Sequence, residues 1–226
     1  DHLAAAAQAA GSTIGILVDL DVGMHRTGLQ TPQLALELAK HVDKMPGLRL
    51  DGLFCYPGHV LDPVAKQTQT LAPVQAKLKE TLDLWQAHGL EAGIVSAGST
   101  PTAYQSHLVT ALTEIRPGTY IYNDRNYVAG GWCTLEQVAA RFICTVVSDA
   151  VPDQVVLDAG SKTLTSDRLV VNPDTAGYGL LVDYPEAVIA KLSEEHGVTH
   201  FPKGAKKPRL GERVSVVPNH ICPCIN

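Results

Sequence analysis

The chain has 226 residues, 45% of them hydrophobic, and a formal net charge of -5 at pH 7, which suits one or two soluble domains with buried cores. The acidic balance and the lack of a basic run exclude the electrostatic footprint of a surface that binds nucleic acid or anionic membranes. No stretch approaches the roughly 20 apolar residues of a membrane span, and the odd number of cysteines, five, predicts a reducing compartment, so we expect a cytoplasmic protein.

The first half of the chain alternates strand-like and helix-like patterns. Apolar runs that end in polar, glycine-containing turns predict short strands at residues 13–20, 48–54, 92–96 and 111–115. Helical spacing of apolar residues predicts a helix from Pro32 to His41, a long one from about Pro63 to His88, and a short one through Tyr104 and His107. The regular strand-turn-helix order predicts parallel strands, and ligands of such sheets bind at the carboxyl ends of the strands.

From about Val138 onward, β-rich runs replace the helical patterns. Strands are predicted at residues 138–148, 154–157, 168–171, 178–182, 197–201 and 213–217. These runs predict a separate, mainly antiparallel β domain. We place the boundary in the segment from Asn126 to Glu136, which gives a first domain of residues 1–130 and a second of residues 131–226.

The number of predicted β/α units indicates how much of a barrel the chain contains. Four units are half of the eight that close a TIM-type barrel, and a half-barrel leaves an edge strand and an apolar face uncovered. The alanine-rich start resembles the end of a helix, and the chain stops directly after a candidate metal motif. We therefore expect the last four units of a (β/α)8 barrel, followed by a β domain that is incomplete at its C-terminus.

Two neighbouring turns could bind a phosphate. Gly98, Ser99 and Thr100 follow a strand and open a helix, which offers backbone N–H groups and hydroxyls, although Ser or Thr before Pro is also a common helix N-cap. Gly118 and Thr119 follow the next strand and could reach the same phosphate. The alternative is that Gly118 only permits a tight turn and that the preceding Arg116 pairs with an acid such as Glu114.

Other polar and aromatic side chains follow the first two strands. Arg26 could hold an anion or orient another site residue, and Tyr56 and His59 could stack on an aromatic cofactor or transfer a proton. Each of them taken alone is equally typical of an ordinary loop.

His220 and Cys222 stand two residues apart at the end of a strand-like run. On an extended segment their side chains would point to the same face, and neutral imidazole and thiolate are good zinc ligands. Two ligands leave positions open for substrate or water. The alternative is a turn with a buried cysteine and a surface histidine, since His-x-Cys is a short pattern.

Seven segments occur together in one order: DVGMHRTG, GLFCYPGH, SAGSTPT, EIRPGTY, LDAGSKTLTSDR, SEEHG and PNHIC. In this order they resemble the D-threonine aldolase and D-serine dehydratase family, whose fold is similar to that of alanine racemase. The resemblance covers nearly the whole chain. It implies pyridoxal 5'-phosphate in the barrel and a divalent metal held by the β domain, with zinc the first candidate and manganese or magnesium the alternatives.

The resemblance also implies roles for particular residues. Thr100, Gly118 and Thr119 would hold the cofactor phosphate, and Gly98 and Ser99 would shape that turn. Two further side chains match the cofactor site, Tyr56 beside the ring and Arg26 at the barrel rim with a less defined role. The metal ligands would be His220 and Cys222.

One departure from the family concerns the lysine that forms the Schiff base with the cofactor. In the family it lies on the first barrel strand, in a segment rich in Pro, His and Lys, and this chain has no such segment. Its lysines, among them Lys40, Lys66 and Lys162, match no equivalent position. The catalytic lysine is therefore expected outside this chain, or the product is a non-catalytic remnant.

The resemblance implies a lyase that acts on small D-3-hydroxy amino acids, as a homodimer. The His-x-Cys form looks closer to the dehydratase branch than to the aldolases, whose motif is His-x-Asp, so we expect a D-serine or D-threonine dehydratase. Three alternatives remain open: a D-threonine aldolase that releases glycine and acetaldehyde, an amino-acid racemase, and a non-catalytic fragment or pyridoxal phosphate-binding protein.

Overall fold

The structure, a computed structural model, describes residues 1–170, 173–174 and 176–225. The chain divides into two compact units, Asp1–Gly118 and Thr119–Asn226.

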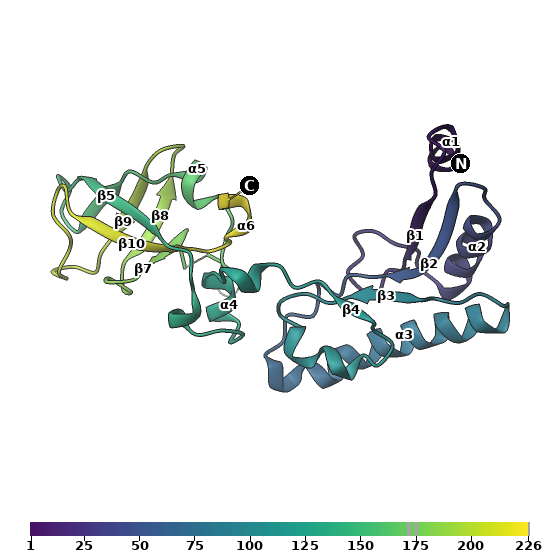
Figure 1. The fold of residues 1–226 in the computed structure, drawn as a ribbon. Coiled ribbons are helices and arrows are strands. Elements are labelled where there is room, and N and C mark those ends of the chain that lie inside the picture. The colour runs from purple at the N-terminus through teal and green to yellow at the C-terminus, as the bar shows by residue number, and fades with distance from the viewer. Residues whose placement is uncertain (171–172, 175, 226) are drawn as a thin grey trace. The chain divides into compact units, whose positions relative to one another are not determined.

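The first unit contains a parallel four-stranded sheet in the order β1-β2-β3-β4 (Figure 1). Its strands are β1 (Ile14–Asp19), β2 (Leu48–Phe54), β3 (Ile94–Ala97) and β4 (Glu114–Ile115). Its helices are α1 (His2–Ala9), α2 (Pro32–Asp43) and α3 (Gln67–Ala87), with the 3-10 helices η1 (Val64–Lys66) and η2 (Ala103–Leu108). The predicted parallel order is confirmed, although β4 is shorter than expected.

Helices α2 and α3 pack on each other, and α2 also packs on β1 and β2. The local sequence explains where α2 begins, because the Thr31 hydroxyl accepts a hydrogen bond from the Leu34 amide and Pro32 follows at the first helical position. Helix α3 contributes fully buried side chains to the same core, among them Leu78 and Trp85. This core supports the sheet whose carboxyl ends carry the candidate site residues.

A bulge interrupts the pairing of β1 with β2. The register shifts between Ile16 and Leu17, so that Ile16 pairs with Leu50 and Leu17 with Gly52. Gly52 has a φ of +151°, and a Cβ there would overlap the carbonyl oxygen of Ile94 on β3. Only glycine suits both the backbone angle and this close approach.

The second unit contains an antiparallel sheet in the order β7-β10-β5-β6-β9-β8. Its strands are β5 (Phe142–Ser148), β6 (Gln154–Leu157), β7 (Gly179–Leu181), β8 (Val188–Leu192), β9 (Gly197–His200) and β10 (Arg213–Pro218). Short helices surround it: α4 (Arg125–Ala129), α5 (Ser161–Leu164), α6 (Cys222–Ile225), η3 (Thr119–Ile121) and η4 (Leu135–Gln137). Its separate core includes Leu157, Leu181 and Ile189.

One strand prediction in this unit was wrong, and one strand was missed. Residues 168–170 of the predicted strand 168–171 form no strand, because the Val170 amide donates to the Asn126 side chain; residue 171 lies outside the described residues. Strand β8 was missed. Its pairing with β9 is irregular between Ile189 and Lys191, which disturbs the alternation of inward and outward residues that marks a strand in sequence.

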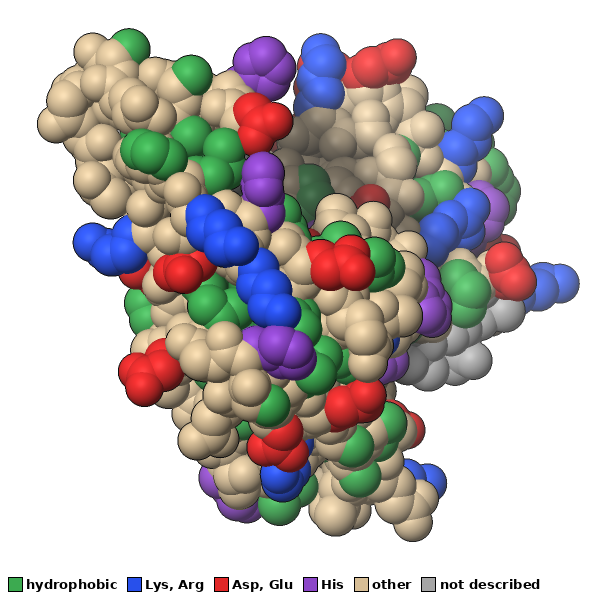
Figure 2. Space-filling view, turned by 90° about the vertical axis from the view of Figure 1, so that its right-hand side faces the viewer, with side chains coloured by type: hydrophobic (Ala, Val, Ile, Leu, Met, Phe, Trp, Pro, Cys, Tyr) green, Lys and Arg blue, Asp and Glu red, His purple; other side chains and the backbone are tan. Residues whose placement is uncertain are grey.

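On the face shown in Figure 2, acidic, basic and histidine side chains are interspersed with hydrophobic ones. This mixture fits the modest net charge of the sequence. Among the described residues, no helix has both the length and the apolar character that crossing a membrane would require.

Candidate functional site

Arg116 is fixed at the carboxyl ends of three neighbouring strands of the first unit. Its Nη2 donates to the carbonyl oxygen of Cys55 at 2.7 Å, just after β2, and its Nη1 donates to the hydroxyl of Ser96 on β3. The guanidinium carbon lies 3.9 Å from the ring centroid of Phe54. Burial lowers the pKa of Arg116, but an arginine stays cationic in proteins, so the strand ends carry a fixed positive charge.

The sequence had suggested only an ion pair between Arg116 and Glu114. Instead, the hydroxyl of Ser96 connects the two, since it donates to a Glu114 carboxylate oxygen and accepts from Arg116. Arg116 was missed as a site candidate. The signal in the sequence was its position directly after a strand, in a turn with Pro117 and Gly118.

The structure brings Arg26 and Tyr56 together, as part of the same group of strand ends. The guanidinium carbon of Arg26 lies 4.8 Å from the centroid of the Tyr56 ring, a cation–π distance. Both side chains line a small cavity together with Asp19, Leu20, Asp21, Met24 and Thr27. The first two strands therefore share one polar and aromatic corner.

Asp21 organises the loop that carries Arg26. Its carboxylate accepts hydrogen bonds from the amides of Gly23 at 2.9 Å and His25 at 3.0 Å, and it lies 2.7 Å from the His25 Nδ1. Burial by itself would raise the pKa of Asp21, but the two amides and the side chains of Gln30 and His25 hold it below its usual range. The carboxylate is thus a fixed anion at the centre of the loop.

The predicted phosphate turn is held by its own hydroxyl groups. Gly98 has a φ of +87°, and the buried Thr102 hydroxyl accepts from the Ser99 amide at 3.0 Å and lies 3.1 Å from the Ser99 hydroxyl. The buried Gln67 of α3 donates to the Pro101 carbonyl oxygen at 2.8 Å. These contacts agree with a turn-shaping role for Gly98 and Ser99, whereas phosphate binding by Thr100, whose side chain is buried, stays a prediction.

Gly118 and Thr119 fall on either side of the division between the units. Gly118 has open space around its Cα, and the Thr119 hydroxyl lies 3.4 Å from the Cys222 sulfur within the second unit. Their predicted share in phosphate binding stays a prediction.

His220 and Cys222 lie in the turn that joins β10 to α6. The expectation of an extended segment was wrong at Cys222, which begins α6. The side chains of His220 and Cys222 are nevertheless half-buried, whereas Ile221 between them is buried at 1% exposure. The intervening residue anchors the turn in the core, and both candidate ligands remain accessible.

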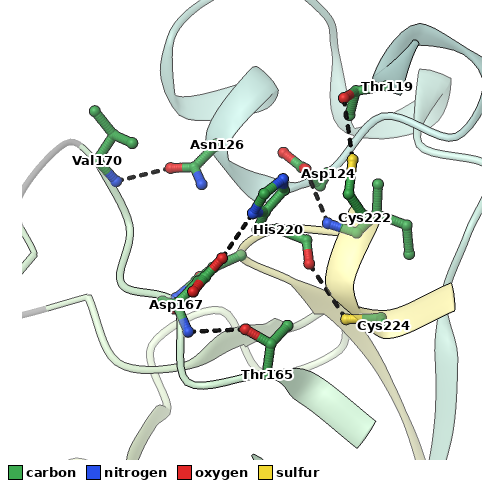
Figure 3. A network of polar contacts seen from close by, with 11 residues as sticks. Thr119, Asp124, Asn126, Thr165, Asp167, Val170, His220, Cys222 and Cys224 are labelled. Carbon is green, nitrogen blue, oxygen red and sulfur yellow. Dashed lines mark hydrogen bonds and ion pairs between the residues drawn. The ribbon is translucent and has the colours of Figure 1, made fainter. Parts of the chain in front are cut away.

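The imidazole of His220 has a carboxylate partner. Its Nδ1 lies 2.6 Å from Oδ2 of Asp167, which leaves Nε2 as the nitrogen available to a ligand (Figure 3). Of the two cysteines in this turn, Cys224 donates its thiol to the His220 carbonyl oxygen at 3.2 Å. Burial, together with nearby acidic groups, raises the pKa of Cys224 to about 12, so Cys224 is a poor thiolate candidate.

Buried polar residues from distant segments hold this turn in place. Asp124 caps α4 by accepting from the Tyr127 amide, and its other oxygen accepts from the Ile221 amide at 3.0 Å (Figure 3). Burial raises the pKa of Asp124, and the hydrogen bonds act in the opposite direction. Asn219, fully buried, donates to the carbonyl oxygens of Asp167 and Gly177.

Sequence reasoning missed Asp124, Asp167 and Asn219 as site residues. Asp167 and Asn219 stand inside two of the segments that carried the family resemblance, but nothing local distinguishes their side chains. In the described part of the chain, no cluster of three or more His, Cys, Asp or Glu side chains could hold a metal ion. A metal here would have two protein donors, and water or substrate would fill its other positions.

Two family models match the chain. One, described as the alanine racemase N-terminal domain, matches residues 1–126, and the other, described as a putative serine dehydratase domain, matches residues 139–226.

Curated relatives are similar over nearly the whole chain. A D-threonine aldolase from Arthrobacter sp is 30% identical over 96% of this chain and 56% of its own length. A D-threo-3-hydroxyaspartate dehydratase from Delftia sp. (strain HT23) is 29% identical over 97% of this chain and 62% of its own length. The chain therefore spans little more than half of these relatives.

A solved structure shows the same likeness. The D-threonine aldolase from Filomicrobium marinum superposes with a TM-score of 0.84 at 28% identity, over 98% of this chain and 59% of that one. The predicted fold class is confirmed, with barrel-type β/α units followed by an antiparallel β domain, as is the predicted resemblance to the D-threonine aldolase and D-serine dehydratase family.

Proposed function

Because the chain belongs to the family of the alanine racemase N-terminal domain and continues into a serine dehydratase-type domain, we propose that it forms part of a pyridoxal phosphate- and metal-dependent lyase of D-3-hydroxy amino acids. The observation that carries the proposal is the turn from His220 to Cys222. It presents one imidazole nitrogen and one thiol, both accessible, on a backbone that buried groups fix in place.

The first unit fits a phosphorylated aromatic cofactor. Its strand ends carry the cations Arg26 and Arg116, the ring of Tyr56, and a turn at Gly98 whose φ of +87° is left-handed. The family implies pyridoxal phosphate, which when bound would serve as an electron sink for negative charge at the substrate Cα. Arg26 and Tyr56 would border the cofactor, and Gly98 and Ser99 would shape the turn in which Thr100, Gly118 and Thr119 hold the phosphate.

The lysines of the first unit lie in helices or at a helix end, and none is on a strand. Lys40 is in α2, Lys66 in η1, and Lys77 and Lys79 are in α3. Lys77 donates to the Gln30 carbonyl oxygen, and Lys79 pairs with Asp83. No proton transfer or attachment of the cofactor is therefore assigned to a lysine of the first unit.

The second unit fits a divalent metal with His220 and Cys222 as its donors. Imidazole and thiolate favour zinc over magnesium, and the two open-sided donors leave room for a substrate oxygen. A bound metal would supply Lewis-acid activation of the substrate 3-hydroxyl. The chain's own contribution is to orient the donors. Asp167 engages Nδ1 of His220 and leaves Nε2 for the metal, and the Cys224 thiol donates to a carbonyl oxygen.

We propose a dehydratase as the first candidate, since the His-x-Cys form resembles that branch of the family. Aldolase activity is the second candidate, because two of the similar proteins are D-threonine aldolases. Both reactions need the same cofactor and metal, so only the products distinguish a dehydratase from an aldolase.

The test is to incubate the complete protein, supplied with pyridoxal phosphate and zinc, separately with D-serine and D-threonine. A dehydratase releases ammonia with pyruvate or 2-oxobutanoate, and an aldolase releases glycine and acetaldehyde from D-threonine. Inversion of the amino acid without either set of products would mean a racemase, and no turnover of either substrate would contradict the lyase proposal.

The metal site is tested separately with the double variant His220→Ala, Cys222→Ala. We expect its zinc content after dialysis to fall to background, whereas the single variant Cys133→Ala should keep the wild-type content. Unchanged zinc in the double variant would count against this site.

We also propose a cytoplasmic homodimer. The odd number of cysteines supports a reducing compartment, and β5 has two exposed apolar side chains, Ile143 and Val147, on one strand. Sedimentation equilibrium of the complete protein would decide its oligomeric state.

A further inference from the structure

The contact between Asp167 and His220 joins two segments that are distant along the chain. Asp167 lies in the loop after α5, and its Oδ2 approaches His220 Nδ1 to 2.6 Å although the residues are 53 positions apart. The two side chains retain 49% and 38% exposure. An exposed pair of this kind adds little to the free energy of unfolding, so stability alone does not explain the contact.

The backbone that carries Asp167 is held in a strained conformation. Thr165 has a φ of +60° and a ψ of 167°, a region that β-branched residues rarely adopt and that costs about 1–3 kcal/mol. Its hydroxyl accepts a hydrogen bond from the Asp167 amide at 2.8 Å, and the Asp167 carbonyl oxygen accepts one from the Asn219 side chain at 3.0 Å. Asp167 is therefore fixed on both sides of its Cα.

The backbone of His220 is fixed by different groups. The thiol of Cys224 donates to its carbonyl oxygen, and the next amide, that of Ile221, donates to Asp124 (Figure 3). Among the contacts described for the His220 side chain, the carboxylate of Asp167 is the one that orients the ring. The main chain thus sets the place of His220, and Asp167 sets the direction of its imidazole.

A carboxylate can only accept, so a neutral imidazole in this contact must carry its proton on Nδ1. The lone pair then lies on Nε2, at the far side of the ring. We propose that Asp167 is a positioning residue, which holds His220 in the Nδ1–H tautomer and directs Nε2 toward a divalent metal. This inference rests on the proposed metal site, and it adds a residue outside the His-x-Cys motif.

Carboxylates that orient metal-bound histidines in this way typically change metal affinity by about 10–100-fold when they are removed. For Asp167→Ala we expect the zinc dissociation constant, measured by competition with a chromophoric chelator, to rise within this range. Asp167→Asn keeps the shape and one acceptor oxygen, so its loss should be smaller. Asp174→Asn, which removes an exposed acidic charge from the same loop, should leave the constant within about twofold of wild type.

A second readout does not depend on the metal. Long-range proton–nitrogen NMR spectra of the metal-free, ¹⁵N-histidine-labelled protein at about pH 8, where imidazoles are ordinarily neutral, report the tautomer of each ring. His220 is assigned from the signal that disappears in His220→Ala. We expect the Nδ1–H tautomer in the wild type and in Asp174→Asn, and a change toward Nε2–H in Asp167→Ala.

An unchanged tautomer in Asp167→Ala would overturn the proposal. It would also be overturned if the tautomer changes but zinc affinity does not, while the double variant His220→Ala, Cys222→Ala loses zinc. If that double variant keeps zinc, the proposed metal site itself has failed, and the metal-free spectra alone then decide whether Asp167 orients His220. Circular dichroism of each variant establishes that it is folded.

Discussion

In the first unit, Arg116 and Tyr56 lie within two residues of the strands that position them, whereas in the second unit the turn from His220 to Cys222 is held by residues from far along the chain. Arg116 comes one residue after β4, and Tyr56 comes two residues after β2. By contrast, Asp124 reaches the Ile221 amide across 97 positions, and Asp167 reaches His220 across 53.

The difference lies in what each sheet provides. Parallel strands bring all their carboxyl ends to one edge, so side chains that follow them meet without further help. The antiparallel sheet provides no such common edge, because neighbouring strands end on opposite sides. In the second unit, buried hydrogen bonds to carboxylate and amide side chains do the positioning instead.

The bulge of β2 is the point at which one substitution should destabilise the first unit most. Gly52→Ala should lower the free energy of unfolding of the first unit by about 4 kcal/mol, because a Cβ would overlap the Ile94 carbonyl oxygen at a φ of +151°. Denaturant unfolding monitored by circular dichroism measures the loss. The site would suffer with the scaffold, since Arg116 donates to the carbonyl oxygen of Cys55 just beyond the bulge.

Gly89→Ala is the matched control for this change. Gly89 also has a positive φ, +74°, but a Cβ there meets nothing within 4 Å. We expect a loss of about 1 kcal/mol from the backbone angle alone. Equal losses at Gly52 and Gly89 would mean that close strand approach does not support the first unit.

A second pair of variants compares the helix caps of the two units. Asp124→Ala should cost about 3 kcal/mol, because it removes a buried carboxylate, leaves the Ile221 amide without its acceptor and takes the side-chain cap from the Tyr127 amide. Thr31→Ala removes a cap that serves one amide, that of Leu34, and should cost about 1 kcal/mol. Chemical denaturation measures both losses.

The Asp124→Ala variant should also weaken zinc binding, whereas Thr31→Ala should not. If the two cap variants lose equal stability and neither affects zinc, the long-range bond to Ile221 does not hold the metal turn.

The difference between the two units also explains which features could be predicted from the sequence. The strands β1, β2, β6 and β10 were predicted nearly to their ends, because apolar runs between glycine-containing turns are local signals. The proximity of Arg26 and Tyr56 could be expected for the same reason, since each follows a parallel strand.

Other features depend on partners that the sequence does not reveal. The segment Arg168–Val170 has the composition of a strand, yet its Val170 amide bonds to Asn126, 44 positions away. Asp167 and Asn219 look like ordinary turn residues, and only tertiary contacts give them their roles. A strained angle such as that of Thr165 has no local signal either.

A third pair of variants concerns the loop after β1, and its effect depends on pH. Hydrogen bonds from the amides of Gly23 and His25 keep the pKa of Asp21 below its ordinary value of 3.8, so the ionised carboxylate stabilises the folded state above that pH. Asp21→Asn keeps one acceptor oxygen but loses the charge, and should cost about 1–2 kcal/mol at pH 7.

The cost should shrink as the pH falls below about 4, because the unfolded wild-type chain then takes up the proton and the charged hydrogen bonds no longer favour folding. Asp83→Asn, at an exposed pair with Lys79, should change stability by less than about 0.5 kcal/mol at either pH. Urea unfolding of the three proteins at pH 7 and near pH 3 measures the effect. A cost for Asp21→Asn that is the same at both pH values would show that the charge of Asp21 does not hold this loop, and the positioning of Arg26 would then need another cause.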